Sequence, residues 1–365
     1  MNILVLTSSN DSFNSVRPEL EIYVSLAKAG HSITLLSEKE SAYAPRFKEN
    51  GVDVIDIRYR KKIDLKAVSL IKRTIKEKNI QIVYATNSRT ISNAIIACIG
   101  ENVKLVTYRG TTGGLYRHDP SSYLNALNPR VNGVICVSEA VTRHVKKQVF
   151  SKNKKVVTIY KGHDTAWYEE TPADLKQFQT NKDNFNIAFV ANVRPHKGLI
   201  YVVKAAHELA DIKDLHILLI GDKISQEPYL SEIKKSGMSE RIHVTGYRKD
   251  VPQIICACDV MIHASTRKEW LPRVILESLG SGTPVIASDN DSSLEIIEDG
   301  INGFIVPKKD AHAIADKIRE LHDSAKLLNK LTTHAKDMIE NKLSHKTTAK
   351  KYIEYFESLL KDKDE

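Results

Sequence analysis

The sequence of 365 residues contains no apolar run near the roughly 18 residues that a membrane-spanning helix requires, so the chain is not predicted to cross a membrane. The segment Met1 to Leu6 lacks basic residues before its apolar ones and turns polar at Thr7. It is therefore predicted to be a buried strand rather than a secretory signal. Cysteines are too few and too scattered for a disulfide framework and lack the spacing of a zinc site, which indicates the reducing cytoplasm. They are Cys98, Cys136, Cys256 and Cys258.

The net charge of +9 is concentrated in the amino-terminal half of the chain. Residues 1–165 hold 26 Lys and Arg against 14 Asp and Glu, whereas residues 166–365 hold 28 against 31. The basic clusters, within 58–78 and 143–155, are either solvated helix faces or contacts to an anionic partner. That partner would be an anionic membrane surface or a phosphorylated acceptor. Nucleic acid is not expected, because no helix-turn-helix, zinc-finger or aromatic-plus-basic RNA pattern is present.

Short β-branched segments alternate with longer helical patterns in both halves, which predicts an α/β fold of parallel sheets covered by helices. Residues 162–184 are polar and without sustained periodicity, and they are expected to form an interdomain connection and hinge. The domains would be 1–165 and 166–346, followed by an amphipathic helix at about 347–365. The expected strands are 2–6, 32–36, 52–57, 82–84, 104–108, 133–137 and 156–160, then 186–190, 216–220, 242–244, 260–264, 284–287 and 303–306.

Two doubly wound sheets would place ligand crevices at the carboxyl ends of their strands, where helix amino termini also point. At one such junction, Lys197 and Gly198 follow the strand 186–190 and open a predicted helix over 199–209. Backbone amides, the helix dipole and an ammonium group together suit a phosphate. Taken alone, Lys197 is equally explained as a cap on an exposed turn.

A second junction carries two carboxylates, Glu269 and Glu277, eight positions apart. On a single helix they would be about 80° out of phase and roughly 12 Å apart, too far to hold one ligand group. With Glu269 in the loop and Glu277 in a helix whose first turn suits Pro272, they could hold the two ends of an extended ligand. The spacing alone also fits two unrelated surface acids.

In order and spacing, these residues resemble family 4 glycosyltransferases of the GT-B fold, which are retaining enzymes that use nucleotide-sugar donors. Glu269 and Glu277 resemble the family's paired glutamates, and Lys197-Gly198 its phosphate-binding lysine and glycine. Further segments extend the resemblance over nearly the whole chain: Cys136-Val137-Ser138-Glu139, Lys161-Gly162-His163-Asp164, Gly282-Thr283-Pro284-Val285-Ile286-Ala287 and the segment 295–304.

The resemblance implies two Rossmann-like domains facing a central cleft, the first binding the acceptor and the second the donor, with the terminal helix packing back on the first. Glu277 would hold the donor ribose, Glu269 the transferred sugar and Lys197 the diphosphate. Amides near Leu271, Pro272 and Arg273 would stabilise the leaving diphosphate, although Pro272 has no amide hydrogen to donate. The segment Gly246-Tyr247-Arg248 would lie near the base. No metal or other cofactor is implied.

The sequence departs from the family pattern at several positions. Asn192 stands where the family usually has an arginine, with Arg194 as a substitute. Arg109 stands at the position of the usual first-domain histidine, and a guanidinium cannot act as a general base near neutral pH. Arg109 could instead bind an anionic sugar or phosphate, and His118 could replace the histidine or be an ordinary surface residue. The segment 289–291 has the Asp-any-Asp spacing of metal-dependent glycosyltransferases but is expected to be a turn after a strand.

The function that follows from the resemblance is transfer of a hexose-type sugar, with retention, to a glycan or lipid-linked acceptor in lipopolysaccharide or capsule synthesis. The protein would work in the cytoplasm, peripherally on the inner face of the membrane. Two alternatives remain: a nucleotide-sugar epimerase or phosphorylase of the same architecture, and a non-catalytic nucleotide-sugar-binding protein that has lost the arginine and histidine positions.

Overall fold

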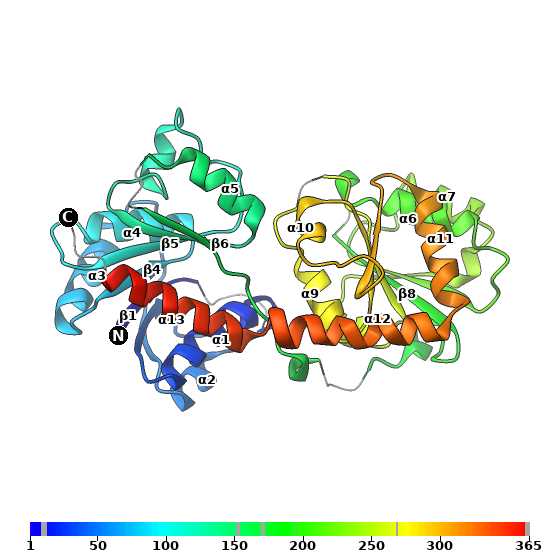
Figure 1. Ribbon diagram of the computed structural model, residues 1–365, viewed down its shortest axis with the longest axis horizontal. Helices are drawn as coiled ribbons and strands as arrows, with labels where there is room; N and C mark the ends of the chain where they lie inside the picture. Colours follow the sequence, from blue (N-terminus) through cyan, green and yellow to red (C-terminus); the bar gives the residue numbers. More distant parts are fainter. Residues whose placement is uncertain (9–12, 151–153, 169–171, 193, 268, 362–365) are drawn as a thin grey trace. The chain divides into compact units, whose positions relative to one another are not determined.

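The computed structural model describes residues 1–8, 13–150, 154–168, 172–192, 194–267 and 269–361 (Figure 1). It divides into two compact units, unit 1 formed by Met1–Gly162 with His345–Glu365 and unit 2 formed by His163–Ser344. Parts of the predicted segments 143–155, 162–184 and 347–365 lie outside the described residues, namely 151–153, 169–171 and 362–365.

Unit 1 contains, in its described part, a seven-stranded parallel sheet of order β3-β2-β1-β4-β5-β6-β7. The interior strand β1 has Ile3 to Leu6 fully buried, because helices cover both faces of the sheet. The strands are β1 (Asn2–Leu6), β2 (Ser32–Ser37), β3 (Asp53–Asp56), β4 (Ile82–Ala85), β5 (Lys104–Arg109), β6 (Val131–Cys136) and β7 (Lys155–Thr158). The helices are α1 (Phe13–Lys28), α2 (Ala44–Glu49), α3 (Leu65–Glu77), α4 (Ser88–Ala97), η1 (Pro120–Leu124), α5 (Glu139–Gln148) and α13 (His345–Lys361).

Helix α13 belongs to unit 1 although it lies beyond unit 2 in the sequence. It packs beside α1, on the side of the sheet opposite α5 (Figure 1). The Tyr352 and Tyr84 hydroxyl groups are 3.0 Å apart, and the Tyr355 hydroxyl donates to the Lys155 carbonyl at 2.7 Å. Phe356 is fully buried in the core of unit 1. The apolar spacing that predicted the helix therefore forms a buried stripe.

Unit 2 contains, within the described residues, a six-stranded parallel sheet of order β10-β9-β8-β11-β12-β13. Its strands are β8 (Phe185–Val190), β9 (Leu215–Ile220), β10 (Ile242–Gly246), β11 (Val260–His263), β12 (Val285–Ser288) and β13 (Gly303–Val306). Its helices are η2 (Thr165–Trp167), η3 (Leu175–Phe178), η4 (Pro195–Lys197), α6 (Leu199–His207), α7 (Tyr229–Lys235), η5 (Ser239–Arg241), α8 (Val251–Cys256), α9 (Arg273–Gly280), α10 (Asp291–Leu294), α11 (Ala311–His322), α12 (Ala325–Asp337) and η6 (Met338–Lys342).

The structure confirms the predicted α/β class of two doubly wound parallel sheets. Each expected strand is present, with ends within two residues of those predicted. Two details differ. Pro272 is the N-cap of α9 rather than part of its first turn. From residue 163 the predicted connection belongs to unit 2, where the burial of Trp167 and Phe178 gives this irregular segment two short helices. No helix in the described ranges is long and apolar enough to cross a membrane.

Candidate active site

Two strand-to-helix junctions in unit 2 lie next to each other because β8 and β11 are neighbours in the sheet. The first runs from β8 through η4 to α6, and the second from β11 to α9. The backbone N–H of Thr266 donates to the His196 carbonyl at 2.7 Å, and the Ser265 hydroxyl donates to the same carbonyl at 3.1 Å. The loops are thus fastened together at the carboxyl edge of the sheet, where parallel α/β folds bind ligands.

Gly198 permits the close approach of these loops. It caps α6 in the left-handed region, with φ of +77°, and an added Cβ would lie 1.8 Å from the Ala264 carbonyl oxygen. A side chain there would both strain the backbone and collide with the second loop. Gly198 therefore lets the loop that carries Lys197 lie close to the second loop.

Lys197 and Glu269, 72 residues apart in sequence, form an ion pair with 2.7 Å between Nζ and Oε1. Glu269 is the more buried partner, with 14% of its side chain exposed against 29% for Lys197. Burial alone would raise the pKa of Glu269, but His263 and Lys197 hold it well below its usual range. The structure therefore brings together two residues that the sequence placed at separate junctions, and it keeps the carboxylate ionised at neutral pH.

His263 is a further member of this cluster that sequence reasoning missed. It is the last residue of β11, is 5% exposed, and places Nε2 3.3 Å from Glu269 Oε2. The sequence feature that could have identified His263 is a titratable residue at the end of an otherwise apolar strand, which lies at the carboxyl edge of the sheet.

Glu277 lies in α9 while Glu269 lies in the preceding loop, the arrangement that lets the pair hold two ends of a ligand. Glu277 is 6% exposed, and its Oε1 is 3.0 Å from Nε of Arg273, the first residue of α9. Burial raises the pKa of Glu277, although Arg273 opposes this. Leu271 is half-buried, and Pro272 is the buried N-cap of α9 and its carbonyl accepts from the Ile275 backbone N–H at 3.1 Å.

Basic residues lie in the two loops that carry Lys197 and Glu269. Asn192 and Arg194, the two candidates for the family arginine, are both exposed. Burial and the charges of Lys197, Arg194 and Arg267 lower the pKa of His196, so this ring is neutral near pH 7. The sequence pattern placed Arg194 near the phosphate position, and the structure adds Arg267 from the second loop.

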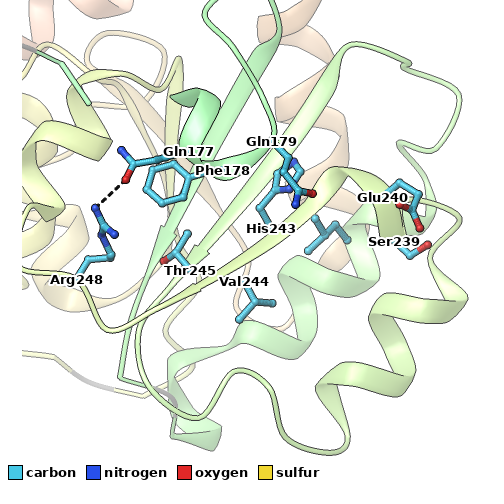
Figure 2. Close-up of a pocket in the computed structure, with 10 residues that line it drawn as sticks. Gln177, Phe178, Gln179, Ser239, Glu240, His243, Val244, Thr245 and Arg248 are labelled. Atoms are coloured by element: carbon cyan, nitrogen blue, oxygen red, sulfur yellow. Dashed lines mark hydrogen bonds between the residues drawn. The ribbon is translucent and has the colours of Figure 1, made fainter. Parts of the chain in front are cut away.

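The segment Gly246-Tyr247-Arg248 begins at Gly246, the last residue of edge strand β10, and continues into the loop that follows. Tyr247 is 58% exposed. The Arg248 guanidinium forms a two-pronged pair with Asp250, at 2.8 and 2.6 Å, and contacts Gln177 at 3.1 Å. Figure 2 shows Arg248 and Phe178 beside a pocket of about 400 Å³ between β10 and η3. The lining residues are Gln177, Phe178, Gln179, Ser239, Glu240, Ile242, His243, Val244, Thr245 and Arg248.

Arg109 and His118 belong to unit 1, whereas the Lys197–Glu269 cluster belongs to unit 2. Arg109 ends β5, and its guanidinium donates to the carbonyl groups of Thr111, at 2.8 Å, and Gly113. Burial lowers the pKa of Arg109. His118 is exposed, with its ring stacked on Tyr116 at 5.5 Å between centroids. The structure thus gives Arg109 a local role in shaping its own loop.

The Asp-any-Asp segment 289–291 follows β12 but is not the simple turn that was expected, because Asn290 is the N-cap of α10 and Asp291 is the first residue of that helix. Asp289 Oδ1 accepts from the Lys308 backbone N–H at 3.0 Å, and Asn290 donates to the Ser265 carbonyl at 2.6 Å. In the part of the chain that the structure describes, no three His, Cys, Asp or Glu residues are grouped to hold a metal.

Curated relatives of the chain include glycosyltransferases from distant organisms. An uncharacterized glycosyltransferase of Methanocaldococcus jannaschii is 25% identical over 231 residues, which are 62% of this chain and 58% of that protein. The UDP-Gal:alpha-D-GlcNAc-diphosphoundecaprenol alpha-1,3-galactosyltransferase of Escherichia coli is 23% identical over 216 residues, 57% of this chain and 55% of that protein. The chain thus spans 55–58% of the length of these two relatives.

Solved structures resemble the chain over almost its whole length. A glycosyltransferase from Rickettsia africae matches with a TM-score of 0.81 at 21% identity, covering 99% of both chains. HepE from Anabaena, in complex with UDP-glucose, matches with a TM-score of 0.75 at 22% identity, covering 98% of this chain and 100% of that chain. These likenesses show the fold, which is GT-B.

Family models match both halves of the sequence. Residues 20–167 match the model described as Glycosyltransferase Family 4, and residues 170–338 match the model described as Glycosyl transferases group 1. These matches extend over both units, and the resemblance predicted from the paired glutamates is confirmed. The chain belongs to glycosyltransferase family 4.

Proposed function

We propose that the chain is a retaining glycosyltransferase that moves a hexose from a UDP-sugar to a glycan or lipid-linked acceptor of a cell-surface polysaccharide. The observation that carries the proposal is the Lys197–Glu269 pair, at 2.7 Å, beside two helix starts in unit 2. HepE, whose structure holds UDP-glucose, supports the nucleotide, and the Escherichia coli galactosyltransferase supports a lipid-linked acceptor.

An ammonium group beside an ionised carboxylate suits the transfer of a sugar from a nucleoside diphosphate. As the bond from the anomeric carbon to the diphosphate oxygen breaks, negative charge collects on the diphosphate and positive charge on the sugar. Lys197 stabilises the first charge and Glu269 the second. The acceptor oxygen bonds to the anomeric carbon on the face that the diphosphate leaves, and its proton passes to the departing diphosphate oxygen.

Fixed charges around the site favour a diphosphate ligand. Lys197 pairs with Glu269 and Arg273 pairs with Glu277, while the further positive charges of Arg194 and Arg267 act on the neighbouring His196. These four cations outnumber the two carboxylates. A nucleoside diphosphate sugar carries two negative charges on its diphosphate and would balance this excess. Arg109 and His118 in unit 1 are proposed to serve the acceptor side, with Arg109 acting through the loop that it shapes.

The experiment that tests this function combines binding with product analysis. UDP, GDP, ADP and their sugars are compared for thermal stabilisation of the protein, and UDP compounds are expected to stabilise it most. The stabilising UDP-sugar is then incubated with a lipid-linked glycan acceptor, and an α-linked product is expected. Isomerised donor without acceptor would indicate an epimerase. Sugar 1-phosphate formed only when inorganic phosphate is added would indicate a phosphorylase, and binding without turnover a non-catalytic protein.

The Glu277→Gln variant is expected to weaken UDP binding by about 1–3 kcal/mol, because a buried carboxylate that accepts the ribose hydroxyl groups becomes an amide. This corresponds to a roughly 5- to 150-fold larger Kd, measured by titration calorimetry. The control is Glu298→Gln in the same unit, where the carboxylate is 42% exposed and pairs with Lys342. UDP affinity equal in the two variants would contradict the ribose role.

We propose that a membrane-facing segment of unit 1 lies in the loop before α3 and at the start of that helix. Along α3 itself, Lys72 and Lys76 lie 3.5 and 3.7 Å from Glu101 and are partly neutralised. Ile63 in the preceding loop is 46% exposed and Leu65, the first residue of α3, is 77% exposed. Lys61 and Lys62 are exposed in the same loop. Exposed apolar and basic side chains together suit an anionic lipid surface.

Two variants that remove the same charge test this segment. Lys61→Gln with Lys62→Gln is expected to reduce sedimentation with phosphatidylglycerol vesicles more strongly than Lys72→Gln with Lys76→Gln. Each basic residue contributes about 1 kcal/mol near such a surface, and Glu101 already offsets part of the charge of the second pair. Equal reductions would mean that only net charge matters. Unchanged sedimentation in both would refute the membrane proposal.

A further inference from the structure

His263 has one ring nitrogen in use and the other buried without a partner. Nε2 lies 3.3 Å from Glu269 Oε2, while Nδ1 is inaccessible to solvent and has no hydrogen-bond partner within the described residues. The residue is 5% exposed, so its ring is held by packing at the end of β11. An unpaired buried polar atom reduces stability, and its presence in a native site calls for an explanation.

The contact with Glu269 fixes which nitrogen carries the proton in the neutral ring. An ionised carboxylate only accepts hydrogen bonds, so the nitrogen that faces it must donate. The proton is therefore on Nε2, and Nδ1 is left as a lone pair without a donor. A leucine at this position would remove the unpaired atom but also the donor to Glu269. The histidine thus supplies a hydrogen bond to Glu269, and its unpaired Nδ1 lowers the stability of the protein.

The two oxygens of Glu269 have partners of different mobility. Oε1 is held by Lys197, which is 29% exposed and sits on a flexible four-carbon stem, whereas Oε2 is held by the buried imidazole. In the proposed function, which this inference assumes, Lys197 must turn from Glu269 to the diphosphate. His263 is then the partner that remains.

We propose that His263 is a positioning residue: it donates from Nε2 to Glu269 Oε2 and keeps the carboxylate aimed at the transferred sugar while Lys197 engages the diphosphate. In this role His263 does not contact the nucleotide-sugar donor. Its removal should therefore affect turnover and leave nucleotide binding unchanged. Replacement by glutamine, which keeps a hydrogen-bond donor at the Nε2 position, should preserve turnover.

Three variants test the role: His263→Gln, whose amide nitrogen replaces Nε2, His263→Asn, whose amide lies near Nδ1, and His263→Leu, which has no donor. We expect Asn and Leu to lower kcat about 10- to 100-fold, the range for a misplaced reacting group, with KM for the UDP-sugar and Kd for UDP within about twofold. Gln is expected to stay within about threefold of the wild type. Equal losses in all three variants, no loss in any, or a change confined to KM would overturn the proposal.

Nitrogen-15 NMR of the wild-type imidazole gives a readout that needs neither activity nor a folded leucine variant. The signals that disappear in His263→Gln are assigned to His263. A protonated Nε2 and an unprotonated Nδ1 are expected, with the Nε2 signal retained when UDP is added and displaced in Glu269→Gln. A proton on Nδ1, or an Nε2 signal insensitive to Glu269→Gln, would overturn the proposal. Wild-type protein that transfers no sugar would refute the proposed function alone, since the NMR result still decides whether His263 holds Glu269.

Discussion

Lys197→Ala is expected to lower kcat about 100- to 1,000-fold, the usual effect of removing one donor that stabilises charge developing in the transition state. Lys197 is the ammonium at the junction of β8 and α6, 2.7 Å from Glu269. Without it, the leaving diphosphate loses its nearest side-chain cation and Glu269 loses one of its two partners. Initial rates at saturating UDP-sugar measure the effect.

Two further variants separate charge from geometry. Lys197→Arg keeps the charge but presents a planar fork in place of a point charge, and it is expected to recover only part of the rate. Lys204→Ala removes an exposed lysine from α6 and is expected to leave kcat unchanged. If Lys197→Ala and Lys204→Ala had the same kcat, Lys197 would have no part in the reaction.

Gly198→Ala is expected to destabilise unit 2 by about 2–5 kcal/mol, because left-handed strain of about 1–2 kcal/mol adds to an overpacking cost of about 1–3 kcal/mol. The overpacking follows from the 1.8 Å between an added Cβ and the Ala264 carbonyl oxygen. Urea unfolding of the full chain, followed by tryptophan fluorescence and amide exchange in unit 2, measures the loss. Turnover is also expected to fall, since the loop that carries Lys197 must move.

Gly246→Ala is the matched control for this substitution. Gly246 has nearly the same backbone, with φ of +71° against +77° for Gly198, but an added Cβ meets nothing within 4 Å. It is expected to lose only the strain of about 1–2 kcal/mol. Equal destabilisation by the two alanines would show that contact with the second loop contributes nothing, and that the loops are held together in some other way.

Most of the fold could be predicted from the sequence because buried parallel strands are continuous apolar runs. The runs at 2–6 and 303–306 match β1 and β13 at both ends. Other strand ends shift by one or two residues, since pairing with a neighbour rather than hydropathy decides the last residue of a strand. The segment 163–184 was harder to predict, because its two buried aromatic residues are separated by polar stretches without a helical or strand period.

The candidate site was predicted in parts. Lys197, Glu269 and Glu277 follow from motif spacing, but their pairing does not: Glu269 meets Lys197 and His263, and Glu277 meets Arg273. Such partners depend on how two loops pack at the edge of a sheet. The role of Arg109 was also hidden, because it donates to backbone carbonyl groups whose directions only the folded loop fixes.

The position of α13 has a consequence for synthesis on the ribosome. Unit 2 has all of its residues once Ser344 has emerged, whereas unit 1, whose sheet is translated first, still lacks Tyr352 and Phe356 from its interior. During synthesis, unit 2 therefore has its complete set of residues before unit 1 does. A polypeptide released after residue 344 would retain an intact unit 2 attached to an unfinished unit 1, a substrate for chaperones and proteases.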